Sequence, residues 1–491
     1  MPLVLFYDRT IGFIRSAGID CAAKRSDRVV RVFEIVGLLI ERESISVDRR
    51  ACLFLGPLFV GVLLLGGLPA PGETKGSQAE RSREVQDDLN AASTIPQEPV
   101  QVPRPSEKAL HYYRSGMRLW GFNQFWALLV PGLIAFSGLS ARLRNLARRL
   151  GKSWFLTVGL YVLFYLAIVF LIDLPLSYYE EFVRQHAYGL SNQTAGKWLS
   201  DSLVRLAVEM TVGFAFTWVP YLLLDRAPRR WWQITTLLAI PFLLATALIK
   251  PIWIDPLYNK YGPMKNQALE RSILALAHRA GIDGSRVFEV EMSVDTKTVN
   301  AYVTGLWGTK RIVLWDTLLA RLDEQEVLVV MAHEMGHYVL GHVMRSILLS
   351  STILLAGLFL VDRLGRRLVA KFSHLLKFED LADIASVPLL LMLIELSTLL
   401  LGPVVMAYSR YQEHEADRFA LDQTGANHAG AMAFVKLQQE NLSNPYPGLV
   451  YRIFSGSHPS ISERIQFFNT YRPTTHTILQ QQKKSNAALG P

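Results

Sequence analysis

The residues with the clearest chemical potential are His333, Glu334 and His337, in the pentapeptide HEMGH. On a helix, side chains four positions apart lie about 40° from each other around the axis, so both imidazoles can bind one Zn²⁺. Glu334 lies near the same face and can take a proton from metal-bound water. The HExxH pattern therefore predicts one Zn²⁺ per chain and metal-assisted hydrolysis. Two unrelated histidines on a surface helix are the alternative.

Catalytic zinc takes three protein ligands, so a third one is required. His342 follows His333 by nine positions, which is about 180° around a helix, and we interpret it as a polar residue at the membrane edge. A better candidate is the stretch SRYQEHEADRFA (409–420), where Glu413 and Asp417 share one helix face. One carboxylate can bind the metal while the other holds a ligand imidazole. A solvated acidic face is the alternative.

Segments long and apolar enough to cross a bilayer flank these residues. They lie near 119–139, 154–175, 203–224, 232–254, 346–361 and 385–407. Two of them separate His337 from Glu413, so the chain returns to the side that it left. The sequence therefore predicts that a membrane hairpin brings the carboxylates back to the histidines.

The composition is typical of a membrane protein. Apolar residues make up 50% of the 491 residues, charged residues make up 19%, and the net charge is +9. We assign the positive excess to cytoplasmic loops and expect no nucleic-acid partner, because the chain has no basic stripe with interleaved aromatic residues. The two cysteines, Cys21 and Cys52, precede the main body, which excludes a cysteine metal site downstream.

The composition changes along the chain and predicts its domain organisation. The N-terminal regions are an unassigned segment (1–50), a signal anchor or first transmembrane helix (51–68) and a disordered linker (69–118). The main body has transmembrane helices (119–254), a catalytic domain with HEMGH (255–345), the membrane hairpin (346–407), a C-terminal helical domain with the third zinc ligand (408–475) and a tail (476–491).

The ordered motifs resemble the type I CAAX prenyl protease family, integral-membrane zinc endopeptidases of the gluzincin group. The resemblance covers roughly 110–475. It rests on LPLSYYEEFVRQHAYGLSNQT (174–194), PLYNKYGPM (256–264), VNAYVTGLWGTKRIVLWDTLL (299–319), HEMGH, SRYQEHEADRFA and SHPSISER (457–464). It implies a mainly α fold of about seven transmembrane helices around a water-filled chamber, with a small zincin-like α+β soluble domain. Arg205, Glu209 and Glu395, which are charges within apolar segments, fit such a chamber or a paired helix interface.

The resemblance also implies roles for individual residues. The zinc ligands are matched by His333, His337 and Glu413, the general base by Glu334, and the supporting acid by Asp417. His458 and Arg464 match the pair that polarises the scissile carbonyl and supports the site. The strand edge that pairs with the substrate backbone is matched by Asn300, Ala301 and Tyr302. From the residues alone, a helix cap at His458 and an ordinary turn at Asn300 are the simpler interpretations.

The expected activity is peptide-bond hydrolysis by metal-activated water, acting on peptide or protein substrates in envelope protein quality control. A CAAX prenyl endopeptidase that removes a C-terminal tripeptide is the alternative, and an inactive lipid-binding or scaffold chamber protein is a second one. The sequence does not determine the oligomeric state.

The distribution of basic residues predicts the orientation in the bilayer. Lys and Arg are frequent before the run 51–68 and in the segments 140–153, 225–231 and 362–384, whereas the loop 176–201 has only Arg184 and Lys197. By the positive-inside rule the first four segments are cytoplasmic. We therefore expect a protein of the cell (inner) membrane with an extracytoplasmic catalytic domain. The eukaryotic members of the family have the opposite, cytosolic arrangement.

Overall fold

The computed structural model describes residues 98–282, 286–304 and 311–472. The chain clusters into two compact units, Met1–Leu65 and Gly66–Pro491, and every described residue belongs to the second. The regions predicted over 1–50, 51–68 and 476–491 lie outside the described residues, as does most of the linker predicted over 69–118.

Six helical segments of the described chain are long and apolar enough to cross a membrane. They are built on α5 (Glu107–Phe136), α7 (Trp154–Ser177), α9 (Ala195–Phe216) with α10 (Trp218–Arg226), α11 (Trp231–Ile249), α15 (His342–Leu376) and α16 (Val387–Thr424). All six predicted segments of the main body are therefore found as helices, and the mainly α fold is confirmed. The helix α6 (Leu139–Leu150) and the helical turn η5 (Ile384–Ser386) lie at the same end of the bundle.

Several of these helices extend beyond the predicted boundaries, as α5 and α16 illustrate. The helix α5 begins at Glu107, inside the stretch expected to be a linker, because Ser106 caps its first turn by accepting a hydrogen bond from the amide of Ala109 at 3.1 Å. The helix α16 continues past the predicted span without a break and carries Glu413 and Asp417. The hairpin and the third-ligand segment are thus joined by one rigid helix rather than by a domain boundary.

A small α+β part is inserted between α11 and α15. Its sheet has the order β1-β2-β4-β3, with β2 and β4 parallel and the other two pairs antiparallel. The strands are β1 (Tyr261–Pro263), β2 (Arg286–Val290), β3 (Ala301–Thr304) and β4 (Arg311–Trp315). The helices around it are α12 (Gln267–Arg279), α13 (Asp316–Leu319), α14 (Glu324–Val339), α17 (Asn427–Glu440), α18 (Leu449–Phe454) and α19 (Ile461–Thr470). The predicted α+β soluble part is therefore present, with β3 at one edge of its sheet.

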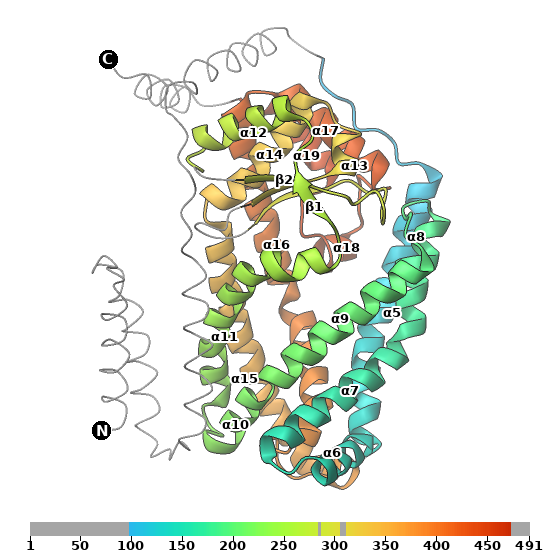
Figure 1. The fold of residues 1–491 in the computed structure, drawn as a ribbon, viewed down its shortest axis with the longest axis vertical. Coiled ribbons are helices and arrows are strands. Elements are labelled where there is room, and N and C mark those ends of the chain that lie inside the picture. The colour runs from blue at the N-terminus through green and yellow to red at the C-terminus, as the bar shows by residue number, and fades with distance from the viewer. Residues whose placement is uncertain (1–97, 283–285, 305–310, 473–491) are drawn as a thin grey trace, which may run out of the picture. The chain divides into compact units, whose positions relative to one another are not determined.

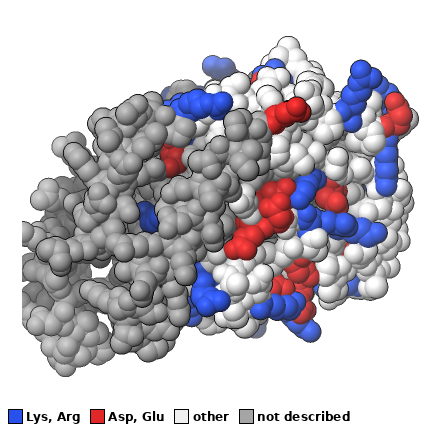
Figure 2. Space-filling view, turned by 90° about the horizontal axis from the view of Figure 1, so that it is seen from above, with Lys and Arg blue, Asp and Glu red and all other residues white. Residues whose placement is uncertain are grey.

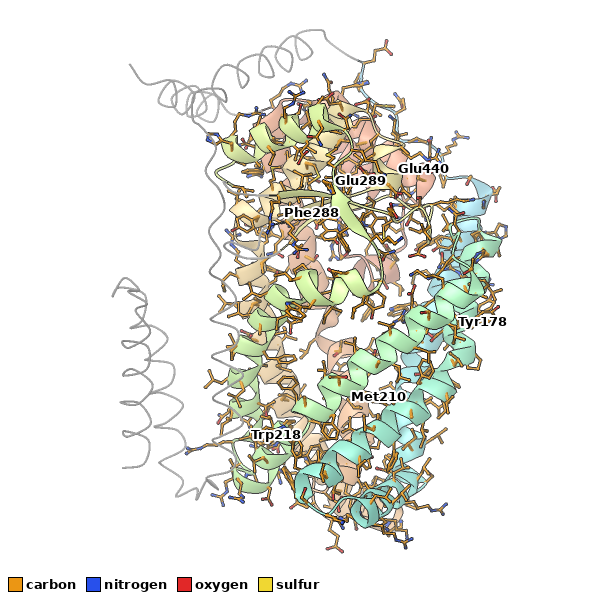
Figure 3. The ribbon with its side chains drawn as sticks, viewed as in Figure 1. Tyr178, Met210, Trp218, Phe288, Glu289 and Glu440 are labelled. Atoms are coloured by element: carbon orange, nitrogen blue, oxygen red, sulfur yellow. The ribbon has the colours of Figure 1, made fainter. Side chains whose placement is uncertain are left out.

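The hydrophobic residues form two cores. One core joins the sheet to α14, α17 and α19 and includes the fully buried Leu314, Met331 and Phe468. The other core joins the membrane-segment helices and includes Tyr161 and Leu376. In Figure 3, Phe288 and Glu289 of β2 lie among the upper elements, and Met210 and Trp218 lie in the lower helices.

Three basic segments meet at the end of the bundle that lies away from the sheet (Figure 1). Arg144 forms an ion pair with Asp383 and donates to the carbonyl oxygen of Lys377 at 3.3 Å. Arg366 donates to the carbonyl oxygen of Pro228. The segments 140–153, 225–231 and 362–384 therefore lie on one side of the helices, as the charge count requires.

Two of the charged residues predicted inside the membrane segments, Arg205 and Glu395, make contacts between helices. Arg205 of α9 forms an ion pair at 2.9 Å with Glu181 of the π-helical turn η1 (Tyr178–Val183). Glu395 of α16 accepts a hydrogen bond at 3.4 Å from Gln124 of α5. Pairing between helices thus accounts for Arg205 and Glu395 in these segments.

The described part of the face in Figure 2 carries basic and acidic side chains beside each other. This mixed pattern differs from the basic stripe that is typical of nucleic-acid binding.

Candidate active site

The site forms where α14 crosses α16. A capping box fixes the start of α14: Asp323 accepts from the amide of Glu326, and Glu326 accepts from the amide of Asp323. Gly336 lies at the crossing, where an added Cβ would be 3.2 Å from the Cα of Ala416. The glycine between the two histidines therefore lets α14 approach α16 closely enough for their side chains to share one centre.

Three side chains converge at this crossing. The Nε2 atoms of His333 and His337 are 3.2 Å apart. Glu413 places Oε2 3.2 Å from Nε2 of His333 and Oε1 3.4 Å from Nε2 of His337. One ligand atom from each residue lies within 4.8 Å of the other two. The structure thus brings together the three predicted ligands, although they come from helices far apart in the sequence.

The chemistry of the donor atoms fits a divalent cation. Glu413 is buried, and its Oε2 accepts no hydrogen bond from the described residues. A buried carboxylate oxygen without a donor is unfavourable unless a cation compensates it. Two imidazole nitrogens and a carboxylate oxygen are a ligand set that zinc accepts, and a further coordination position would remain for water.

Asp417 and Arg464 support His333 from behind. Oδ1 of Asp417 is 2.9 Å from Nδ1 of His333, so the carboxylate can fix the ring with Nε2 toward the centre. Arg464 donates to both oxygens of Asp417, at 2.6 and 2.9 Å, and its guanidinium lies 4.0 Å from the ring centroid of Phe434. Although burial lowers the pKa of Arg464, the attraction of Asp417 outweighs it and raises the pKa, so the cation is retained.

His342 supports His337 in a similar way, which the sequence did not predict. Its Nδ1 is 2.9 Å from Nδ1 of His337, and its carbonyl oxygen accepts from Gln412 at 3.2 Å. On one continuous helix, His342 would lie on the face opposite His333. In fact α14 ends at Val339, and Gly341, with φ of 69°, turns the chain so that His342 faces back. In the sequence, the glycine directly before His342 was the feature that could have predicted this turn.

Glu334 and His458 both face one cavity of about 570 Å³, which His333 and Arg464 also line. Burial raises the pKa of Glu334 above its ordinary value, against the attraction of His333 and His337. His458 directs Nε2 to within 3.3 Å of Oε1 of Glu413. It is not the cap of α19, since that cap is Ser460, whose hydroxyl accepts from the amide of Glu463.

The predicted strand edge borders the same cavity in part. Asn300 and Ala301 line it, whereas Tyr302 does not and instead places its hydroxyl 3.1 Å from that of Tyr261. The amide of Trp315 in β4 donates to the carbonyl oxygen of Asn300, so by strand alternation the backbone of Ala301 points to the free edge. There its amide donates to Oδ1 of Asn300 at 2.9 Å.

Comparison with known proteins identifies the class to which this fold and site belong. The profile of Peptidase family M48 matches residues 263–472, and that of the CAAX prenyl protease N-terminal region, five membrane helices, matches residues 91–260. The chain therefore belongs to Peptidase family M48, and it is an integral-membrane metalloendopeptidase that acts on peptide substrates.

Individual relatives agree with this assignment. The uncharacterized metalloprotease YhfN of Bacillus subtilis is 35% identical over 431 residues, which is 87% of this chain and 96% of the relative. CAAX prenyl protease 1 of Saccharomyces cerevisiae is 30% identical over 310 residues, 60% of this chain and 68% of the relative. The crystal structure of S. mikatae Ste24p has the same fold, with a TM-score of 0.63, 24% identity and coverage of 79% of this chain and 96% of that one.

Proposed function

We propose that the chain is a zinc endopeptidase that cleaves proteins of the cell envelope from the extracytoplasmic side of the membrane. The observation that carries the peptidase assignment is the convergence of His333, His337 and Glu413 beside Glu334 in a cavity bordered by the sheet edge. Zinc bound there would polarise water and the scissile carbonyl.

The residues of the chain perform the remaining steps. Glu334 accepts a proton from the attacking water and returns it to the leaving amine. His458 and Arg464 stabilise negative charge on the carbonyl oxygen. The peptide lies along β3, where the backbone of Ala301 aligns it through main-chain hydrogen bonds.

The metal is the first element to test. Because the site offers two imidazoles and one carboxylate, we expect purified protein to contain one zinc per chain by elemental analysis. Glu413→Gln should lower the bound zinc, since the amide carries no charge. Glu440→Gln, which changes a carboxylate at the end of α17 outside the cavity, is the matched control. Full zinc retention in Glu413→Gln would mean that Glu413 is not a ligand.

The contact between His342 and His337 leads to a second prediction. If His337 faces the metal with Nε2, its Nδ1–H donates to Nδ1 of His342, and His342→Leu removes that acceptor. Loss of such a partner typically weakens metal binding by about 10–100-fold. A competition titration against a chromophoric chelator should show this loss, with partial recovery in His342→Gln.

The exposed His374, near the far end of the same helix, gives the control variant His374→Leu. Equal zinc affinity in His342→Leu and His374→Leu would refute the role assigned to His342.

The extracytoplasmic orientation is supported by the basic segments, which meet at the end away from the catalytic residues. Alkaline phosphatase fused after Pro491 should therefore be active in a bacterial host. A fusion after Lys152, in the basic segment 140–153, should be inactive and serves as the control. Fluorescence from a cytosol-only reporter at Pro491 would reverse the assigned orientation and remove the argument for envelope substrates.

Processing of a prenylated C-terminus is the second candidate function, favoured by the likeness to CAAX prenyl protease 1 of Saccharomyces cerevisiae. The two candidates predict different results with a peptide library offered with and without a farnesylated cysteine. A quality-control protease should cleave unmodified peptides. Strict dependence on the farnesyl group would establish the second candidate instead.

A further inference from the structure

Arg184 lines the cavity that contains His333 and Glu334, although the metal chemistry does not use it. It is the first residue of α8 (Arg184–Ala187), directly after the π-helical turn η1, and it is only 8% exposed. Buried guanidinium groups are normally paired with a carboxylate, because an isolated charge in the interior is unfavourable. The buried guanidinium of Arg184 therefore requires a compensating partner.

All the described partners of Arg184 are neutral. Its Nη2 donates to the carbonyl oxygen of Tyr112 at 2.8 Å and to the hydroxyl of Ser115 at 3.3 Å, and its Nε donates to the same hydroxyl at 3.3 Å. Its guanidinium carbon lies 3.9 Å from the ring centroid of Tyr112. Within the described ranges it has no ion pair with a carboxylate, and its Nη1 donates to no protein atom. Two nitrogens thus hold the group in place while the third stays available.

The other charged residues of the cavity do not neutralise Arg184. The charged side chains that line it are Glu334, Arg184, Arg410, Arg452 and Arg464. Two of these arginines have their own carboxylates, since Arg464 is paired with Asp417 and Arg452 is paired with Glu463 at 2.7 Å. Arg410 instead donates to two carbonyl oxygens. The lining therefore has a surplus of positive charge, which is suited to an anionic ligand.

The packing around Arg184 keeps the guanidinium in one orientation. Gly116 of α5 lies against it, and a Cβ added there would be 3.2 Å from Nη2. The guanidinium carbon lies over the rings of Tyr112 and Tyr188, 3.9 and 5.6 Å from the respective ring centroids. A planar, pre-oriented guanidinium is the group that proteins use to bind carboxylates with directional hydrogen bonds.

We propose that Arg184 binds a carboxylate of the peptide substrate and thereby sets the position of the cut. This inference rests on the proposed peptidase function, because the bound carboxylate belongs to the peptide that lies along β3. The carboxylate is either the free C-terminus or an acidic side chain, which share the same chemistry at Arg184. In both cases cleavage occurs at a fixed distance from the anion.

Three peptides that differ only at the C-terminal end test this with the purified full-length chain. The first has a free C-terminal carboxylate, the second has a C-terminal amide, and the third is an amide that ends in Glu. Hydrogen bonds to a charged group make the wild type favour the carboxylate-bearing peptides over the plain amide by about 10–100-fold in kcat/KM. Arg184→Gln should reduce this ratio to about 1, because it slows cleavage of the two carboxylate-bearing peptides more than cleavage of the plain amide.

Arg114→Gln is the matched control, because it removes an exposed arginine outside the cavity. Arg114 lies in the turn of α5 that also carries Tyr112 and Ser115, the partners of Arg184. It should keep the wild-type ratio. If the wild type prefers only the free acid, the ligand of Arg184 is the C-terminal carboxylate. If it prefers both carboxylate-bearing peptides, Arg184 binds either the C-terminal carboxylate or an acidic side chain.

The proposal is overturned if the wild type cleaves all three peptides equally or if Arg184→Gln keeps the preference. It is also overturned if Arg184→Gln lowers cleavage of all three in proportion, since that is the result for a residue that only ties α8 to α5. If the wild type cleaves no peptide at all, the peptidase proposal itself fails, and this inference fails with it.

Discussion

Glu334→Gln is expected to abolish peptide hydrolysis while zinc remains bound. The substitution keeps the size of the side chain but removes its capacity to accept a proton from water. General-base catalysis typically contributes about 10²–10⁴-fold, and the loss should reach at least this range because no second carboxylate lines the described cavity. The three proposed ligands, His333, His337 and Glu413, are unchanged in this variant.

The measurement combines turnover of an internally quenched peptide with elemental analysis of the same sample. Glu440→Gln is the control, since Glu440 is partly exposed and pairs with Arg321 at 3.4 Å. Turnover by Glu334→Gln within a few-fold of the wild type would mean that a different group activates the water. Loss of zinc together with activity would instead make Glu334 part of the metal site.

The membrane segments could be predicted because their length and apolar composition determine them, whereas the small α+β part was expected from the family resemblance. Six apolar stretches of the main body gave six helices. Their ends were less accurate, since the polar first turn of α5 and the charged last turns of α16 continue a helix beyond its apolar window. Hydropathy identifies the part of a helix that is immersed in the bilayer, whereas hydrogen bonds and caps determine where the helix ends.

The meeting of His333, His337 and Glu413 could also be predicted, because helical spacing and the returning hairpin determine it. The position of His342 could not be predicted from helical spacing, since the break at Gly341 changes the direction of the chain. The environment of Arg184 could not be predicted from the sequence either. Its burial and its lack of a carboxylate partner among the described residues depend on how α5 packs against α8, which leaves no local pattern in the sequence.

His458→Ala should lower kcat by about 10²–10³-fold, which corresponds to about 2.7–4 kcal/mol of transition-state stabilisation. The imidazole is held by a contact of 2.8 Å between its Nδ1 and the hydroxyl of Ser457, which leaves Nε2 directed at the site. Alanine removes this donor without disturbing the cap of α19 at Ser460. The variant should therefore fold normally and bind peptide with little change in KM.

The distance of 3.3 Å between Nε2 of His458 and Oε1 of Glu413 makes a second role geometrically accessible, namely that of a metal ligand. The two roles predict different metal contents. A residue that stabilises the carbonyl oxygen can be removed without loss of zinc, whereas removal of a ligand weakens metal binding. Elemental analysis of His458→Ala, with His374→Ala as the control, distinguishes them.

Retained zinc with a large loss of kcat would assign His458 to the transition state and leave Glu413 as the third ligand. Loss of zinc would require the ligand set to be revised, because His458 would then share the coordination with His333, His337 and Glu413. Wild-type kcat with wild-type zinc would exclude both roles. In that case Arg464, held by both oxygens of Asp417, would be the remaining cation positioned to stabilise charge at the carbonyl oxygen.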